Sequence, residues 1–211
     1  MKTLILDTES TGLFDYRKRA DEEGQPRIAQ IAMLLVEASD DWSQVHTETD
    51  CDFLIRPDGW EMPADLAEKL GHGITQERLL ADGIPIADAL DRYTNLFDQV
   101  ELIAGFNVEY DLKLVRGELR RLGRPDRYAE RPVFCAMRAA TPLCAIPRKN
   151  GRGFKFPKLA EAVEILCGAP ITGAHNAAHD AQSSLSVIRA LRDRGVDIIG
   201  KEQPRKLQET T

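Results

Sequence analysis

The stretch Lys2-Thr3-Leu4-Ile5-Leu6-Asp7-Thr8-Glu9-Ser10-Thr11-Gly12-Leu13 predicts a buried β-strand over Lys2 to Asp7 that ends in a turn. If the strand continues past Asp7, the side chains of Asp7 and Glu9 point to the same face, about 7 Å apart. A carboxylate at the end of a buried strand is costly unless it is hydrogen-bonded, paired or bound to a metal. The alternative is an ordinary polar strand terminus, with Asp7 starting the turn.

The rest of the fold follows outward from this strand. Residues 28–36 and 50–56 predict two more strands and therefore an antiparallel meander, and residues 14–27 predict an exposed loop. Thr75 is expected to cap a helix in which Ile74 packs on Leu79. Short strands at 101–105 and 133–136 alternate with helices, which predicts an α/β sandwich. The expected helices cover residues 85–97, 108–122, 159–166 and 181–188.

Composition narrows the class of protein. With 211 residues, 43% hydrophobic and 29% charged, the chain fits one soluble globular domain. No apolar run is long enough to span a membrane, so we expect a cytoplasmic protein with no membrane partner. The four cysteines have no C-x-x-C spacing, which favours reduced thiols over a zinc site. A net charge of −6 argues against non-specific coating of duplex DNA, but it leaves room for metal-binding carboxylates and for a local basic groove.

Two further segments carry an acidic residue close to the start of an expected helix, at the border of its buried face. Asp111 falls in the first turn of the helix after 101–105, beside its apolar stripe, with Asn107 as the expected cap. Its alternative role is a favourable interaction with the helix dipole. The small-residue segment 173–181 opens the last helix. There Asp180 falls toward the buried face, whereas His179 is expected to face solvent, and His175 precedes the helix.

Together these residues resemble the three motifs of the DnaQ-like (DEDDh) 3′-5′ exonuclease family, in order. The motifs are Asp7-Thr8-Glu9-Ser10-Thr11-Gly12-Leu13, Asn107-x-x-x-Asp111 and His175-x-x-x-x-Asp180. The resemblance implies an RNase H-like fold, in which helices flank a mixed five-stranded sheet of antiparallel meander and parallel strands. It covers about residues 2–193, so we expect an exonuclease domain over 1–193 and a charged, flexible tail over 194–211.

The resemblance also implies the chemistry of the site. It makes Asp7, Glu9, Asp111 and Asp180 the ligands of two divalent ions, Mg²⁺ or Mn²⁺, which can stabilise charge on the attacking and leaving oxygens of a phosphodiester. It makes His175 the general base, for which an imidazole pKa near neutrality is suitable. Many family members have a histidine before the asparagine of the second motif, where this chain has Phe106. We expect Phe106 to pack in the core or to stack beside the substrate.

Substrate-binding residues are expected around the first motif. The resemblance makes Leu13 a wedge against terminal bases. The neighbouring residues and Asn107 would surround the terminal nucleotide, with Phe14 adding apolar surface. The alternative for Leu13 and Phe14 is packing within the turn. Residues 147–158 combine five cations, including Lys155, with Phe154 and Phe156, and they resemble a guide for nucleic acid, the alternative being a solvated loop. A second basic cluster is expected to be a solvated helix face. The motif residues implied are Thr8, Ser10, Thr11 and Gly12, and the second cluster is Arg116, Arg120, Arg121 and Arg124.

The expected substrate is the single-stranded or frayed 3′ end of DNA, because Arg56-Pro57-Asp58-Gly59-Trp60 and His72-Gly73-Ile74-Thr75 resemble the branch of the DNA polymerase III epsilon subunit. This branch implies proofreading or DNA repair and a possible DNA polymerase partner, although the short charged tail favours a freestanding enzyme. The alternatives are an RNA-trimming exoribonuclease of the same family and a non-catalytic nucleic-acid-binding module. A His/Asp metallophosphohydrolase lacks the further separated histidines it would need.

Overall fold

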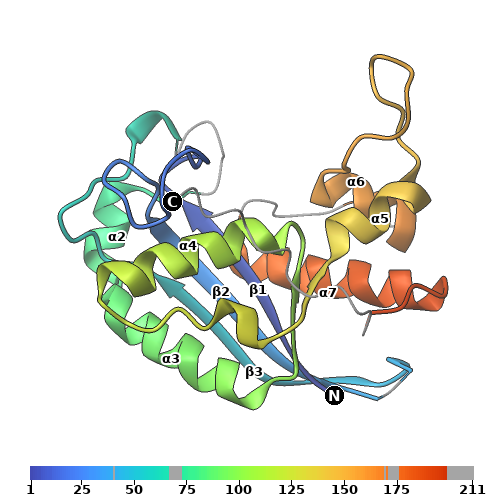
Figure 1. Ribbon diagram of the computed structural model, residues 1–211, viewed down its shortest axis with the longest axis horizontal. Helices are drawn as coiled ribbons and strands as arrows, with labels where there is room; N and C mark the ends of the chain where they lie inside the picture. The colour runs from blue at the N-terminus through green and yellow to red at the C-terminus, as the bar shows by residue number, and fades with distance from the viewer. Residues whose placement is uncertain (40, 67–72, 169, 171–175, 199–211) are drawn as a thin grey trace.

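The computed structural model describes residues 1–39, 41–66, 73–168, 170 and 176–198 (Figure 1). Its strands are β1 (Lys2–Ser10), β2 (Ile28–Ala38), β3 (Val45–Leu54), β4 (Leu102–Gly105) and β5 (Val133–Cys135). Its helices are α2 (Gln76–Asp82), α3 (Ile86–Gln99), α4 (Val108–Arg121), the 3₁₀ turn η1 (Tyr128–Glu130), α5 (Ala136–Cys144), α6 (Leu159–Cys167) and α7 (Ala177–Asp193).

The five strands form one mixed sheet in the order β3-β2-β1-β4-β5. Strands β1, β2 and β3 are antiparallel neighbours, whereas β4 and β5 run parallel to β1. The α/β fold with a mixed five-stranded sheet is therefore confirmed. The predicted end of the first strand at Asp7 was too early, because Thr8, Glu9 and Ser10 continue to pair with β2.

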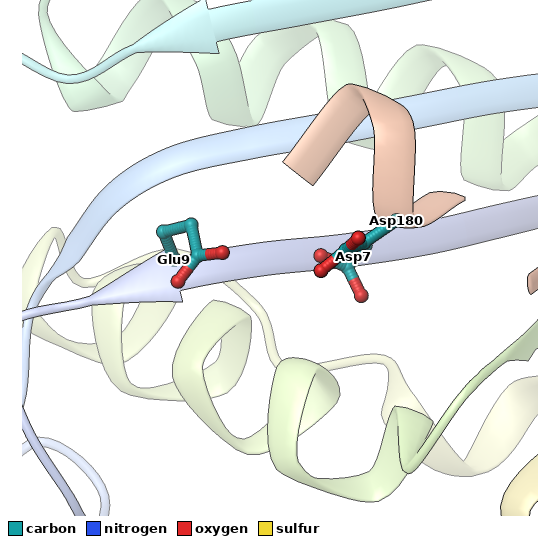
Figure 2. Close-up of side chains that lie close together, drawn as sticks. All are labelled: Asp7, Glu9 and Asp180. Atoms are coloured by element: carbon teal, nitrogen blue, oxygen red, sulfur yellow. The ribbon is translucent and has the colours of Figure 1, made fainter. Parts of the chain in front are cut away.

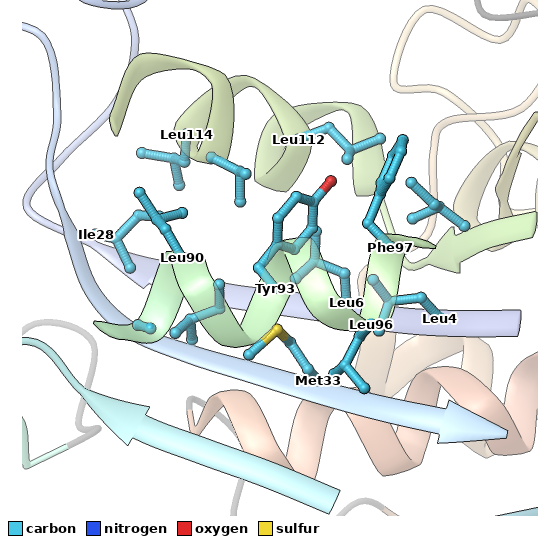
Figure 3. Close-up of a cluster of buried hydrophobic side chains, with 14 of the residues drawn as sticks. Leu4, Leu6, Ile28, Met33, Leu90, Tyr93, Leu96, Phe97, Leu112 and Leu114 are labelled. Atoms are coloured by element: carbon cyan, nitrogen blue, oxygen red, sulfur yellow. The ribbon is translucent and has the colours of Figure 1, made fainter. Parts of the chain in front are cut away.

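Helices cover both faces of the sheet, and the alternation of β1 divides the core between them. Leu4 and Leu6 pack with α3 and α4 on one face, where Figure 3 shows them beside Tyr93, whereas Ile5 packs with α5, α6 and α7 on the other. Asp7 and Glu9 follow Ile5 at spacings of two. They therefore point to the face that α7 covers (Figure 1).

Two predicted helix caps have different outcomes. Thr75 caps α2 as predicted, because its hydroxyl accepts a hydrogen bond from the backbone nitrogen of Arg78 at 3.2 Å, and Ile74 and Leu79 share a buried cluster. Asn107 stands at the start of α4, but its side chain makes no capping hydrogen bond. Its backbone is left-handed (φ 66°), a conformation that asparagine tolerates better than most residues.

Two expectations about exposure were wrong in part. The 14–27 segment is not simply an exposed loop, because Phe14 and Ala20 are buried in the core. The predicted solvated arginine face is instead a network of ion pairs: Arg116 and Arg120 contact Asp126, Arg121 contacts Glu118, and Arg124 contacts Asp91.

The chain continues to pack beyond the last helix. Val196 and Ile198, which follow the expected domain boundary at 193, lie against the cluster on the α7 face. The remainder of the expected tail, residues 199–211, lies outside the described residues. Within the described ranges, none of the helices combines the length and apolar character needed to cross a bilayer.

Candidate active site

Three carboxylates meet where β1 ends beside the first turn of α7. Because the strand persists, Asp7 and Glu9 project from the same face of β1, and α7 brings Asp180 to them (Figure 2). One carboxyl oxygen of each residue lies within 4.8 Å of the others. Residues 173 positions apart in the sequence thus form one acidic cluster, as the order of the motifs predicts.

Asp111 reaches the same place from the other face of the sheet. It lies in the first turn of α4, is 4% exposed, and accepts hydrogen bonds from the backbone nitrogen of Thr8 at 3.0 Å and from its hydroxyl at 2.6 Å. Thr8 lies between Asp7 and Glu9 in β1, so this pairing fixes Asp111 directly behind the acidic cluster. The structure therefore brings all four predicted acids to one end of β1.

Burial, and for Asp7 and Glu9 also the charges of their neighbours, raises the pKa values of these carboxylates. Burial and the charges of Asp180 and Asp111 raise the pKa of Glu9 to about 7. Burial, followed by the charges of Asp111, Asp180 and Glu9, holds the pKa of Asp7 well above its usual range. Burial also raises the pKa of Asp111, against the opposing hydrogen bonds from Thr8. An all-oxygen donor set with this excess of negative charge fits a hard divalent cation such as Mg²⁺ or Mn²⁺.

The raised pKa of Glu9 predicts how the metal-free protein responds to pH. Its folded pKa of about 7 lies above the ordinary value of 4.5, so the native state keeps this proton to higher pH than the unfolded state. Stability is therefore lost as pH rises from 4.5 to about 7, on the order of 2–3 kcal/mol for this group. We expect Glu9→Gln to reduce the difference in unfolding free energy between pH 4.5 and pH 8, measured by urea denaturation in chelator.

The control for this experiment is Glu37→Gln, which removes an exposed carboxylate at the far end of β2. It should leave the pH dependence unchanged. Equal pH dependence in Glu9→Gln and the wild type would contradict the assigned pKa of Glu9.

The start of α7 is held by contacts that position Asp180. The side chain of Asn176 caps the helix by accepting a hydrogen bond from the backbone nitrogen of His179 at 3.2 Å. Buried Gln30 of β2 accepts another from the backbone nitrogen of Ala177 at 3.2 Å. His179 is only partly exposed, and its Nδ1 lies 3.8 Å from a carboxyl oxygen of Asp180. The prediction that His179 faces solvent is thus only half right, and His175 lies outside the described residues.

The turn after β1 is rigidly tied to its surroundings. The Ser10 hydroxyl donates to the carbonyl of Gly12 at 2.9 Å, and the Tyr110 hydroxyl donates to the same oxygen. Thr11 accepts a hydrogen bond from the backbone nitrogen of Arg27 at 2.9 Å. Leu13 projects from this turn with 87% of its surface exposed. A fixed turn with one exposed apolar side chain can present a surface beside the acidic cluster.

The aromatic residues expected near the substrate are placed differently. Phe14 is 7% exposed and packs edge-on against Tyr110, with ring centroids 5.3 Å apart. It belongs to the core and offers little surface to a substrate, contrary to expectation. Phe106 is half-buried and packs against the cluster on the α7 face, whereas Asn107 is exposed. The packing expected as one role for Phe106 is therefore present.

Sequence reasoning missed the positioning roles of Tyr110 and Gln30. Tyr110 reaches a carbonyl 98 positions away, and Gln30 reaches a backbone nitrogen 147 positions away. Neither contact has a local sequence signal, because each depends on how distant elements pack. Tyr110 does precede Asp111 directly, and Gln30 does pair opposite Glu9 in the sheet.

Solved structures share this fold at low sequence identity. A "full-length 3'-exonuclease" matches with a TM-score of 0.64 at 15% identity, over 93% of this chain and 62% of that one. Pop2p of S. pombe, described in an "Mg2+ and Mn2+ bound form", matches with a TM-score of 0.65 at 17% identity, over 91% of this chain and 83% of that one. "Cell-death related nuclease 4 (CRN-4)" matches with a TM-score of 0.66 at 12% identity, over 92% of this chain and 64% of that one. The chain thus spans less than two thirds of the first and third of these proteins.

The family assignment rests on the sequence and agrees with the fold and the acidic cluster. The RNase_T exonuclease family model matches residues 4–188, and the chain belongs to this family. No curated protein matches the sequence. Family membership and the carboxylate cluster together support a metal-dependent exonuclease, which is a hydrolase of nucleic acids.

Proposed function

We propose that this protein is a 3′-5′ exonuclease that hydrolyses single-stranded or frayed 3′ ends of DNA and releases nucleoside 5′-monophosphates. The observation that carries the proposal is the meeting of Asp7, Glu9 and Asp180 at the end of β1, with Asp111 joined to them through Thr8. Burial and the neighbouring carboxylates raise the pKa of Asp7 and of Glu9, so the metal-free site is destabilised, and a protein that only binds nucleic acid gains nothing from such a site.

Asp7, Glu9, Asp111 and Asp180 are the proposed ligands. When bound, two Mg²⁺ or Mn²⁺ ions would supply positive charge to the attacking and leaving oxygens of the scissile phosphate. The buried hydrogen bonds from Thr8 to Asp111 orient one carboxylate, and the capped start of α7 orients another. His175, five positions before Asp180, is the proposed acceptor of the water's proton.

The proposed substrate contacts lie around the turn after β1. Leu13 is the strongest candidate for contact with the terminal bases, because it is 87% exposed beside the cluster. Thr8, Ser10, Thr11 and the Gly12 carbonyl are all engaged in hydrogen bonds within the protein, so we expect them to act mainly by holding the turn in place. Phe106 and Asn107 would border the site from the start of α4, and Lys155 is a more remote candidate.

RNA is the alternative substrate. One structure of similar fold is described as "3'-end specific recognition of histone mRNA stem-loop by 3'-exonuclease", at 19% identity and a TM-score of 0.61. It covers 91% of this chain and 64% of that one, so the likeness extends only to the fold. A role in proofreading or repair, and a DNA polymerase partner, stay predictions from the sequence motifs.

The test compares DNA and RNA single strands of one sequence, labelled at the 5′ or the 3′ end, with Mg²⁺, with Mn²⁺ and with chelator. We expect a metal-dependent ladder that shortens from the 3′ end, with DNA cut faster. His175→Ala should slow the cleavage by about 10²–10⁴-fold, because the general base is lost. His179→Ala is the matched control and should cost much less. Persistent binding without cleavage would favour the non-catalytic module, and faster RNA cleavage would favour the exoribonuclease.

A further inference from the structure

A short hairpin projects from the body between α5 and α6. Residues 146–156, called the arm below, extend beyond both helices at the upper right of Figure 1. Pro147 and Phe154 pair as an antiparallel bridge, and the backbone nitrogen of Arg148 donates to the carbonyl of Gly153 at 3.1 Å. Gly151 and Gly153 both have positive φ, near 70°, as a tight turn needs. The arm thus has a defined conformation.

The base of the arm is fixed to the protein. Ile146 packs against the core on the α7 face, and its carbonyl accepts a hydrogen bond from the backbone nitrogen of Lys155 at 2.9 Å. The Lys155 ammonium donates to both carboxyl oxygens of Glu161, at 2.6 and 2.7 Å, and Glu161 also accepts the backbone nitrogen of Lys158 at 2.7 Å. Lys155 therefore braces the arm against the first turn of α6.

The outer surface of the arm is apolar and cationic at once. Phe154 is 43% exposed and Phe156 is 55% exposed, although burying such rings would be favourable. Arg148, Lys149 and Arg152 are exposed and, in the part of the chain that the structure describes, none is within ion-pair distance of a carboxylate. Residues 146–158 contain no acid, in a chain whose net charge is −6. This surface therefore lacks the partners that would neutralise it.

The other arginine cluster shows the contrast. Arg116 and Arg120 share Asp126, at 2.7 and 3.0 Å, and Arg124 pairs with Asp91 at 2.9 Å. Those cations are already balanced, so a polyanion gains little there. Exposed cations beside exposed aromatic rings are the combination that holds single strands, because cations follow phosphates and rings stack on bases without regard to sequence.

We propose that the arm is a second binding site for single-stranded nucleic acid, separate from the acidic cluster. Phe154 and Phe156 stack on bases, and Arg148, Lys149 and Arg152 contact phosphates. The inference rests on the proposed function in one respect, that the 3′ end of the same strand reaches Asp7. A strand long enough to touch both sites binds through both, whereas a dinucleotide at the acidic cluster does not reach the arm. The arm therefore affects KM for long substrates and leaves kcat unchanged.

The first test measures binding without catalysis. Fluorescence anisotropy in chelator compares a labelled 20-nucleotide single strand, as DNA and as RNA, on the wild type and on the double variant Phe154→Ala/Phe156→Ala. We expect Kd to rise at least about tenfold. Lys149→Gln/Arg152→Gln should also reduce the slope of log K against log salt by about 1.4, since each lost phosphate contact removes about 0.7. Leu122→Ala removes an apolar side chain of similar exposure (42%) from the end of α4 and should leave Kd unchanged.

The second test separates the arm from the acidic cluster. With Mg²⁺, the aromatic double variant should lose at least about tenfold in kcat/KM on the 20-nucleotide strand and cleave a dinucleotide at the wild-type rate. Unchanged Kd in the double variant would overturn the proposal, and so would an equal loss on both substrates. If the wild type cleaves neither substrate, the proposed function fails, while the anisotropy experiment still decides the role of the arm.

Discussion

Replacing Asp7 with asparagine is expected to lower the rate of 3′-end hydrolysis by at least about 10³-fold, because the change removes a charged ligand from the centre of the acidic cluster. Asp7 contributes an oxygen within 4.8 Å of those of Glu9 and Asp180, and burial and the charges of Asp111, Asp180 and Glu9 all disfavour its charged form in the absence of metal. The measurement is single-turnover cleavage of a 5′-labelled strand at saturating Mg²⁺. A second readout is the rise in Tm that Mg²⁺ causes in the wild type, which should disappear.

The matched control is again Glu37→Gln, an acid-to-amide change on an exposed residue opposite Lys2, at the other end of the sheet. It should keep both the cleavage rate and the Tm response to Mg²⁺. In chelator, Asp7→Asn should be at least as stable as the wild type, since it removes a carboxylate from a repelling group. Cleavage by Asp7→Asn within tenfold of the wild type would exclude Asp7 as a metal ligand.

Replacing Glu118 with alanine is expected to lower the free energy of unfolding by about 3–5 kcal/mol, because it leaves two arginines without their shared carboxylate. Glu118 is 1% exposed and accepts two hydrogen bonds from the Arg27 guanidinium, at 2.8 and 3.0 Å. It also accepts the backbone nitrogen of Ile28 at 3.2 Å, and Arg121 lies 3.3 Å away. The residue thus joins α4 to the start of β2. Urea denaturation measures the loss.

The control for Glu118 is an exposed ion pair. Glu48→Ala breaks the pair with Lys2, which is 2.7 Å long and partly exposed to solvent, and should cost much less than Glu118→Ala. Glu118→Gln keeps an oxygen for the Ile28 nitrogen and should fall between the two. If Glu118→Ala costs no more than Glu48→Ala, the buried ion pair does not hold α4 against the sheet.

The same variant also has a consequence for the site. Arg27 exchanges backbone and side-chain hydrogen bonds with Thr11, so loss of Glu118 frees the segment that supports the turn after β1. Truncating Glu118, which lies seven positions after Asp111 in α4, would then raise KM through the turn that carries Leu13. Sequence inspection gives no reason to single out Glu118, which lies in a helix rich in charged residues.

Much of the fold was predictable because its signals are local. Nearly continuous apolar runs identified β1 and β2, and the apolar stripe identified α4, although β1 proved three residues longer than predicted. That extension depends on pairing with β2, with a change of register between Glu9 and Ser10. A turn-like sequence such as Thr-Glu-Ser can still be drawn into a strand when its neighbour supplies the hydrogen bonds.

The burial of individual side chains was the property hardest to predict from the sequence. Phe14 was expected on the substrate-facing surface and lies in the core, and Arg116 was expected in solvent and is paired with Asp126. In both cases the residue type permits either state. Whether the side chain is buried or exposed depends on the side chains that pack against it. These come from α3, from α4 and from the segments that follow these two helices.

The sequence by itself determined most of the strand-and-helix order, because this follows from residue type and spacing, and the resemblance of its motifs to a known family indicated the class of protein and the four acids. Only the tertiary structure decided how the acids are held. Thr8 donates two hydrogen bonds to Asp111, 103 positions away, and Gln30 accepts one from the backbone nitrogen of Ala177 at the start of α7, 147 positions away. Such contacts join elements distant in sequence, and their hydrogen bonds exist only once packing has excluded water and fixed the distances between them.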